Sequence, residues 1–352
     1  MTLATLPSVA IIVNALIFLV IPALSRHDIF FSITVSRDFR DTTIARATLR
    51  RYRVGVLAGS IGALVAVQMA TSSPHLIVPA VFVQTIAATA AWAWAHRTIR
   101  PHAAIPSAVR VAALVPRDLS YPGGAVAIVG PFLVLGAAAW LLHANWDFIP
   151  DRIPAHWNIY GTPDRWTTKS GRGMFVPLAF AAVIILAVQV QAWFIVRRTR
   201  QIVVTGASAD AEQQFKRRTA AYSVLSTFIV AALFGYFAMR TVVTSDDNLG
   251  WGFALIMGLV VLSGLGFAGW LLIAGQGGQR RVAPDARSAT LGDASPDSAW
   301  KAGVFYFNPD DSAILVEKRM GLGWTLNLGN RLAWLFLLLA IGVPFLIALF
   351  MR

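Results

Sequence analysis

Eight apolar runs of roughly 20 residues alternate with polar connections along the sequence. A helix of that length crosses the roughly 30 Å hydrocarbon core of a bilayer, and a helix also pairs the backbone groups that lipid cannot solvate. None of the runs contains Asp, Glu, Lys or Arg. The pattern predicts an all-α polytopic membrane protein with eight transmembrane helices, at residues 3–24, 54–71, 76–95, 125–142, 174–196, 221–239, 251–274 and 332–351.

Composition agrees with this fold class. Of the 352 residues 57% are hydrophobic and only 13% are charged, about half the charged fraction of an ordinary soluble domain. The chain has no cysteine, which excludes disulfides, thiolate metal sites and cysteine nucleophiles. The formal net charge of +13 would point to nucleic acid in a soluble protein, so its distribution must be considered.

The basic residues are concentrated in alternate connections. Residues 26–53, 97–117, 197–218 and 280–331 hold 24 of the 30 Lys and Arg residues, and the remaining connections and the C-terminus hold six. Cytoplasmic loops carry such an excess, so we expect a multi-pass cell-membrane protein with both termini extracytoplasmic and these four connections in the cytoplasm. The bilayer is then the expected partner of the basic surface, and no nucleic-acid partner is expected.

The outside connection at residues 143–173 is rich in Pro and Trp, which favours an ordered loop. It contains the runs Ile149-Pro150-Asp151-Arg152-Ile153-Pro154, His156-Trp157-Asn158, Gly161, Pro163-Asp164 and Lys169-Ser170. On these residues, the region of about 128–195 resembles a domain of unknown function found in SdpI-type bacterial membrane proteins. Proteins of that type give immunity to a secreted peptide toxin and sense it, so the resemblance implies that this loop binds or senses a toxin peptide.

The candidate ligand-binding residues of this loop are His156, Asn158, Gly161, Asp164 and Lys169. The loop also holds His143, Asp147 and Asp151, which are metal-ligating types, but the spacing matches no recognised metal motif. The sequence therefore favours hydrogen bonding by His156 and Asn158 within the loop, and we expect no metal and no cofactor.

The last inside connection divides into two parts. Residues 275–299 have the Gly, Ser, Ala and Pro content of a flexible linker. Residues 300–331 predict a small cytoplasmic domain with a β-hairpin, which pairs residues 304–307 with 313–316 across a turn. The basic and aromatic residues of the segment 318–328 suit an anionic membrane surface.

The segment 300–331 resembles a second uncharacterised small domain, through Phe307-Asn308-Pro309-Asp310-Asp311 and the later Gly321, Gly323-Trp324-Thr325 and Asn327. Residues 30–35 and 50–53 are similar to the same multispanning family. The resemblance makes this domain a candidate contact for a cytoplasmic regulator, through Asn308, Pro309, Asp310, Gly323, Trp324 and Asn327.

The predicted organisation has six regions: three helices in 1–124, the SdpI-like region 125–200, two helices in 201–274, the linker 275–299, the small domain 300–331 and a last helix in 332–352. Polar residues inside the runs predict hydrogen bonds between helices, at Asn14, Gln68, Gln84, Gln189 and Gln191. Small residues predict close helix packing at Gly55, Gly59, Gly264 and Ala268.

Three classes of function are compatible with this pattern. A non-enzymatic receptor, immunity or sensor protein would use the outside loop to bind a peptide or lipid and the inside domain to relay or recruit. A small-molecule or lipid transporter is the first alternative, although charged residues are missing from the runs. A membrane-embedded metal-dependent hydrolase is the second, and it would depend on the acidic and histidine residues near His156. We expect the first class.

Overall fold

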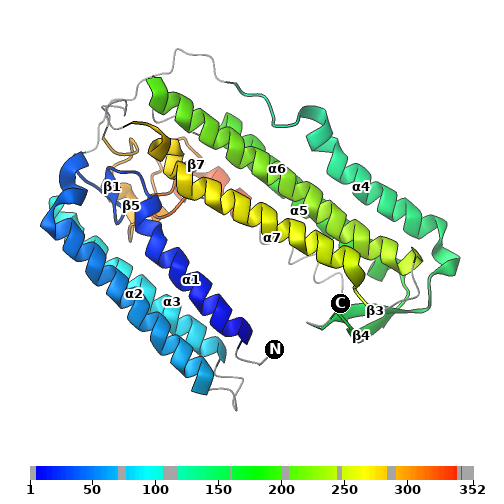
Figure 1. The fold of residues 1–352 in the computed structure, drawn as a ribbon. Coiled ribbons are helices and arrows are strands. Elements are labelled where there is room, and N and C mark those ends of the chain that lie inside the picture. The colour runs from blue at the N-terminus through cyan, green and yellow to red at the C-terminus, as the bar shows by residue number, and fades with distance from the viewer. Residues whose placement is uncertain are drawn as a thin grey trace. The chain divides into compact units, whose positions relative to one another are not determined.

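The computed structural model of this chain describes residues 5–69, 77–105, 118–158, 161–199, 206–243, 248–283, 291–338 and 342. In that part of the chain, each of the first seven predicted runs lies on a long helix (Figure 1). These helices are α1 (Thr5–Leu24), α2 (Thr43–Met69), α3 (Ile77–Ile99), α4 (Gly124–Ala144), α5 (Gly171–Arg197), α6 (Gly206–Val243) and α7 (Gly250–Ala274).

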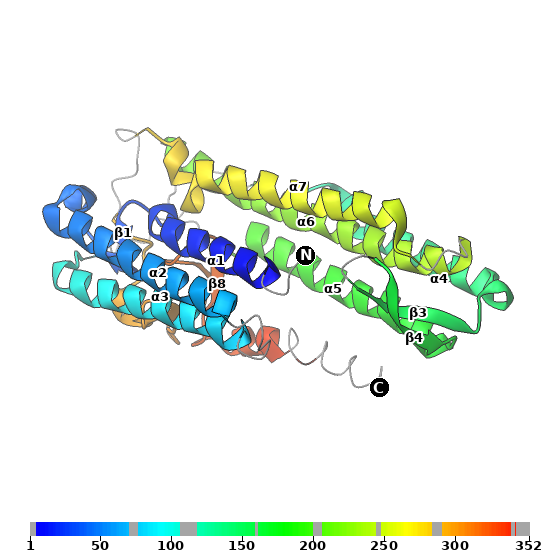
Figure 2. The ribbon, with the colours of Figure 1, turned by 60° about the horizontal axis from the view of Figure 1, so that its bottom comes forward.

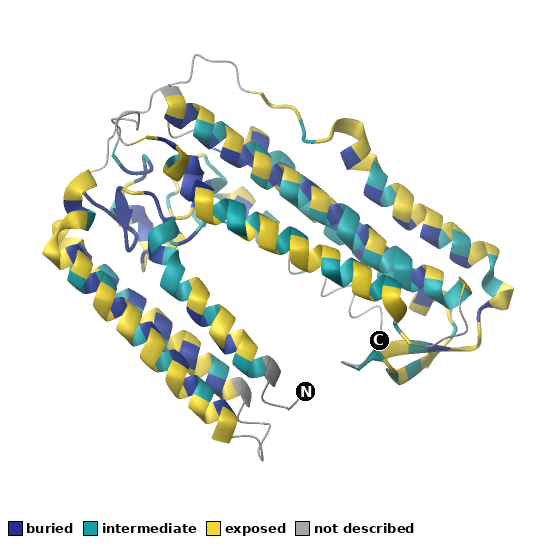
Figure 3. Ribbon diagram, in the orientation of Figure 1, coloured by how far each residue is buried: buried dark blue, intermediate teal, exposed yellow. Residues whose placement is uncertain are grey.

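Six helices, α1, α2 and α4 to α7, are long and apolar enough to cross a membrane. Large apolar side chains on them are exposed, such as Val126 and Leu133 on α4, and a water-soluble protein would bury such a band (Figure 3). The prediction of a helical membrane protein is confirmed at this level. Residues 332–338 of the eighth run are helical, but most of that run lies outside the described residues, so the count of eight spans stays a prediction.

The chain forms two compact units, each assembled from segments that are distant in sequence. Unit 1 contains Met1–Pro116, Arg200–Glu212 and Leu271–Asn330, and unit 2 contains Arg117–Thr199, Gln213–Trp270 and Arg331–Arg352. The small domain predicted at the end of the chain therefore folds together with the N-terminal helices in unit 1. The helices α6 and α7 each begin in one unit and end in the other.

In unit 1, α2 and α3 lie side by side along their lengths (Figure 2). A Cβ added at Gly59 would lie 2.6 Å from Cβ of Ala87, and one at Gly55 would lie 3.1 Å from Cβ of Ala91. Only glycine permits this approach, which confirms the close packing predicted there.

Four of the five polar residues predicted to bond between helices do so, and the bond predicted at the exposed Gln191 stays a prediction. Gln84, which is buried, donates to the carbonyl of Ile11 and to Oγ of Ser60, and Asn14 donates to Gln84. Gln68 donates to Ser8, and in unit 2 Gln189 of α5 donates to two carbonyls of α4. Amides inside lipid-embedded helices thus find partners on neighbouring helices.

Two predictions about helices need correction. Hydropathy places the second helix at residue 54 and the sixth at residue 221, but α2 begins at Thr43 and α6 at Gly206. Thr42 caps α2, since its Oγ1 accepts from the backbone N–H of Ala45. The packing predicted at Gly264 is wrong, because nothing described lies within 4 Å of a Cβ at that position.

The short strands form four separate antiparallel pairs among the described residues. Unit 1 holds β1 (Ile29–Phe30) with β2 (Ile33–Thr34), β5 (Trp300–Lys301) with β6 (Phe305–Tyr306), and β7 (Leu315–Glu317) with β8 (Trp324–Leu326). Unit 2 holds β3 (Arg152–Trp157) with β4 (Pro163–Thr168).

The predicted pairing of residues 304–307 with 313–316 is therefore wrong. Both segments contain strands, but β6 pairs with β5 and β7 pairs with β8. The physical reason is Asn327, which binds the turn between them and forms a parallel bridge with Tyr306. The strands on either side of the turn are thus held apart by a third segment.

The structure also differs from the flexible linker expected at residues 275–299. Gln276–Arg281 form a 3-10 helix, and Gln276, Gly277 and Gly278 are buried. A Cβ at Gly278 would lie 2.5 Å from the carbonyl oxygen of Ala211, near the start of α6. Asp293 and Ser295 are buried as well, so the described parts of this segment are packed into unit 1.

Candidate functional site

The loop between α4 and α5 is an ordered antiparallel hairpin of β3 and β4. Arg152 pairs with Thr168 at its base, and Trp157 pairs with Pro163 near its tip. The register shifts on either side of His156, which places His156 opposite Arg165. Such an irregularity re-aims a side chain, here toward the exposed side of the hairpin.

Lys169 fixes the base of this hairpin. Its ammonium group donates to the carbonyls of Trp146 at 3.2 Å and Ile149 at 2.9 Å, and it lies 5.5 Å from the centroid of the Trp146 ring. Asp151 completes an ion pair at 3.7 Å. The sequence makes Lys169 a candidate ligand-binding residue. In the structure its ammonium group donates to carbonyls of its own loop.

Asn158 and Gly161 form the tip. The backbone N–H of Thr162 donates to Oδ1 of Asn158, the N–H of Asn158 donates to the carbonyl of Thr162, and Gly161 has φ of +77°. The tip also bonds to the segment before α7, because the N–H of Leu249 donates to the carbonyl of Gly161 at 2.9 Å. Trp157 stacks on Phe237 of α6 with ring centroids 5.4 Å apart, so both ends of the hairpin are anchored within unit 2.

His156 and Asp164 are the predicted site residues that meet at the surface of the hairpin. Nδ1 of His156 donates to Oδ1 of Asp164 at 2.6 Å, and the two side chains are 54% and 45% exposed. Because the carboxylate can only accept, Nδ1 carries a proton and Nε2 is left to face solvent or a ligand. The described residues contain no group of three or more His, Asp and Glu residues that could hold a metal ion.

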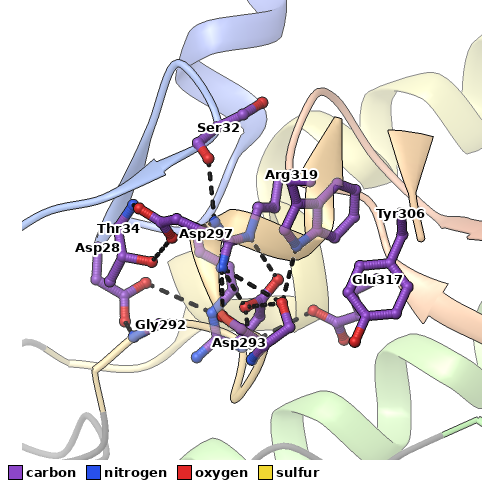
Figure 4. A network of polar contacts seen from close by, with 12 residues as sticks. Asp28, Ser32, Thr34, Gly292, Asp293, Asp297, Tyr306, Glu317 and Arg319 are labelled. Carbon is purple, nitrogen blue, oxygen red and sulfur yellow. Dashed lines mark hydrogen bonds and ion pairs between the residues drawn. The ribbon is translucent and has the colours of Figure 1, made fainter. Parts of the chain in front are cut away.

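A second polar site lies in unit 1, where parts of all four basic connections meet. Arg319, at the end of β7, is its centre and is fully buried (Figure 4). Its Nε and Nη2 donate to the two carboxylate oxygens of Asp293 at 2.9 and 2.8 Å, and Nη1 donates to Asp297 at 2.5 Å. The carbonyls of Ser32 and Ser295 accept two further bonds. Every nitrogen of the guanidinium group is therefore engaged.

Electrostatics keep this cluster ionised. Burial by itself would raise the pKa of Asp293, but the charge of Arg319 and hydrogen bonds from Arg319 and Ser295 outweigh burial, and the pKa lies below its usual range. Burial would lower the pKa of Arg319, yet Asp293 and Asp297 raise it above its ordinary value. A buried pair with these directions is charged throughout the physiological range.

The cluster ties the segment 291–319 to the end of α1 and to the β1–β2 turn. Ser25 donates to the carbonyl of Arg319, and the carboxylate of Asp28 accepts from the backbone N–H of Gly292. Arg26 forms ion pairs with Asp28 at 3.5 Å and with Glu317 at 3.8 Å. Three polar residues just after α1, Ser25, Arg26 and Asp28, thus bind a segment more than 260 residues away in sequence.

Two more arginines cover the carboxyl ends of helices, which carry partial negative charge. Arg40 donates to the carbonyls of Pro22, Arg26, His27 and Ile29, and burial lowers the pKa of Arg40 to about 10, with Asp28 opposing the shift and Arg280 adding to it. Arg280 donates to the carbonyls of Ala23 at the end of α1 and Leu272 at the end of α7. The basic residues of this unit therefore join the ends of two helices.

The residues predicted to contact a cytoplasmic regulator fall into two groups. Asn327 is buried, and its amide donates to the carbonyls of Asn308, Asp311 and Ala313. Gly323 exchanges two hydrogen bonds with the side chain of Gln276. Asn308 and Trp324 are half-buried, and Pro309 and Asp310 are exposed in the turn. The side chains of Asn308 and Asn327 therefore stabilise the fold of this segment.

Sequence reasoning missed the Arg319 cluster. It placed Arg319 on a segment facing the membrane surface, and that placement is wrong because Arg319 is buried. It placed Asp293 and Asp297 in or beside a linker. The alternation Asp293, Ser295, Asp297 was the available signal, since three polar side chains at every second position can converge on one cation.

Two family models match parts of the chain. Residues 133–181, which include the end of α4, the β3–β4 hairpin and the start of α5, match a domain of unknown function, DUF1648. Residues 309–334, which include β7 and β8, match a family of unknown function, DUF5808. No curated protein and no solved structure matches the chain. The first match contains the β3–β4 hairpin, and the second contains Arg319 but not Asp293 or Asp297, so the chain is similar to the two families over those segments.

Proposed function

We propose that this chain is a non-enzymatic bacterial receptor or sensor of the cell membrane, with an immunity role as its physiological use. Its β3–β4 hairpin binds an extended peptide on the extracytoplasmic side. The observation that carries the proposal is the hairpin itself, which is pinned by Lys169 at its base and by Leu249 and Phe237 at its tip, and which exposes the His156–Asp164 pair between them.

A peptide suits this surface better than a compact ligand does. In the described part of the chain, β3 and β4 pair only with each other, so each strand keeps an outer edge of backbone donors and acceptors. An extended peptide can add to such an edge, with backbone hydrogen bonds giving affinity and side chains giving selectivity. The exposed polar side chains of Arg152, His156, Asp164 and Arg165 supply that selectivity.

The sensing role rests on α6 and α7. Near the hairpin, Tyr236 of α6 donates to the carbonyl of Leu249, whose N–H bonds to the hairpin tip. The opposite ends of both helices belong to unit 1, where Gly278 packs on Ala211 and Arg280 bonds to Leu272. A peptide that shifts the tip therefore acts on α6 and α7, whose opposite ends belong to unit 1. We assign the Arg319 cluster of unit 1 to the cytoplasmic side because of the basic residues there.

The test uses cells that lack the protein, challenged with a panel of purified secreted antimicrobial peptides. Complementation with the wild-type chain should restore survival for at least one peptide, and His156→Ala should not. Thr168→Ala is the matched control, because Thr168 is exposed on the same hairpin away from the ion pair. Immunoblots of membrane fractions establish that all variants are equally abundant.

Direct binding separates peptide from lipid as the ligand. The protein in nanodiscs should bind the protective peptide with an affinity that falls at least tenfold in His156→Ala and not in Thr168→Ala. Survival that is equal for wild type and His156→Ala at equal abundance would contradict the proposed site. If survival depends on His156 but the protein does not bind the peptide, the ligand of the hairpin is a lipid and not a peptide.

A further inference from the structure

The β5–β6 hairpin exposes an apolar face that the small domain does not cover. Phe305 is 57% exposed and Phe307 is 45% exposed, while Tyr306 between them is buried. This alternation is that of a strand with one face in the protein and the other outside it. Lys301 pairs with Phe305 across the hairpin and is also exposed.

The turn of this hairpin lies against a helix that packs along a membrane span. A Cβ at Gly303 would lie 2.8 Å from Nδ1 of His96 in the last turns of α3, and Gly303 has φ of +71°, so only glycine fits. His96 also bonds to the carbonyl of Phe31 through Nδ1 at 2.7 Å. The hairpin is therefore fixed to the end of α3 by a close backbone contact.

The depth of that contact follows from the packing of α3 on α2. Ala91 of α3 faces Gly55 of α2, next to the start of the apolar run of α2. His96 is five residues farther along α3, which corresponds to about 7.5 Å of helix. The start of that apolar run, taken as the hydrocarbon boundary, puts His96 at the depth of the headgroup layer, together with the exposed Arg50 and Arg51 of α2.

We propose that the β5–β6 hairpin is a membrane anchor, with Phe305 and Phe307 in contact with the lipid at the headgroup boundary and Lys301 at the anionic headgroups. Three observations carry this inference: the exposed aromatic face, the depth set by Gly303 and His96, and the basic residue beside the aromatic ones. Aromatic side chains flanked by cations favour this layer. The sequence predicts that the segment 318–328 contacts the membrane, but Arg319 of that segment is buried. We therefore assign the membrane contact to the β5–β6 hairpin.

The test exploits the absence of cysteine in the chain. Phe305→Cys and Phe307→Cys are each labelled with the fluorophore NBD in the full-length protein, reconstituted in vesicles of phosphatidylcholine and phosphatidylglycerol. Asp310→Cys is the matched control, because Asp310 is exposed in the turn after β6. Lipids that carry a nitroxide near the headgroup then quench fluorophores that lie in the interface.

We expect nitroxide lipids to quench the labels at positions 305 and 307 at least twofold more than the label at 310, with emission shifted to the blue. Iodide in the aqueous phase should show the reverse order. Quenching by lipid that is equal at all three positions, together with full access to iodide, overturns the proposal and leaves the face for a protein partner. Single-cysteine Lys301→Cys, which lies opposite Phe305 on the same face of the hairpin and is exposed, repeats the test if a phenylalanine variant fails to reconstitute.

Discussion

Arg319→Met is the sharpest test of the buried cluster in unit 1. The substitution keeps the length and apolar character of the side chain but removes the cation that Asp293 and Asp297 share. Asp293 is only 5% exposed, so its carboxylate would remain in the interior with Ser295 as a partner and without its counter-ion. Breaking a buried ion pair by removing one partner costs about 3–5 kcal/mol.

That cost should appear as easier opening of the domain, since opening brings Asp293 to water. With about 1.4 kcal/mol per factor of ten, the opening equilibrium should increase roughly 100- to 4,000-fold. The assay is thiol labelling of Ala299→Cys, a buried position in the same domain of a chain that otherwise has no cysteine. The labelling rate reports the open fraction when closing is faster than labelling.

Lys318→Met provides the matched control, because it removes the same charge from the adjacent exposed position. It should change the opening free energy by less than about 0.5 kcal/mol. Arg319→Lys should fall between the two, since the single nitrogen and three donors of an ammonium group cannot replace the bonds from three guanidinium nitrogens to Asp293, Asp297 and the two serines. If Arg319→Met labels no faster than Lys318→Met, the cluster does not hold the domain closed and the reasoning is refuted.

Three further predictions address charge, hydrogen bonding and helix packing. Because the folded pKa of Asp293 lies below its unfolded value of about 3.9, its contribution to stability is present above that pH and is lost as pH falls through the folded pKa. The hydrogen-exchange protection factors of residues 291–330, which are corrected for the intrinsic pH dependence of exchange, should fall below about pH 4, and a fall that begins near pH 7 would exclude this group. Asn327→Asp should destabilise the domain by about 3 kcal/mol or more, because a carboxylate would face three carbonyls, and Asn327→Ala should cost less in the same exchange measurement. Gly59→Val should cost about 1–3 kcal/mol through its contact with Ala87, while Gly62→Val, with nothing within 4 Å, should leave the thermal midpoint in detergent unchanged.

The helices could be predicted from the sequence because apolar runs of about 20 residues have one stable form in lipid. Their ends could not, since hydropathy reports the lipid boundary and a helix continues beyond it. Residues 206–220 of α6 contain Asp210, Glu212 and Lys216, yet they are helical. Where a chain leaves the membrane, capping and packing decide the end of the helix, as Thr42 does for α2.

The two candidate sites also differ in how far each could be predicted from the sequence. The β3–β4 hairpin depends on contacts between neighbouring residues, such as His156 with Asp164, and the local sequence predicts an ordered loop there. The Arg319 cluster joins residues near position 30 with residues near 293 and 319, and no local pattern contains that pairing. Burial of a lone arginine follows from carboxylates elsewhere in the chain, so only the tertiary structure reveals it.

The surplus of the four basic connections therefore serves two separate physical roles. Arg50 and Arg53 are exposed on α2, and exposed arginines beside an apolar run are typical of the cytoplasmic side of a membrane, on which our proposal places them. Arg280 and Arg319 bond to backbone carbonyls and carboxylates within unit 1, where they fix helix ends and strands to one another. Both roles require the arginine to lie outside the hydrocarbon core of the bilayer, so a count of basic residues in each connection does not distinguish them. Since the first role needs only charge and the second needs the guanidinium geometry, Lys can replace Arg50 but not Arg319.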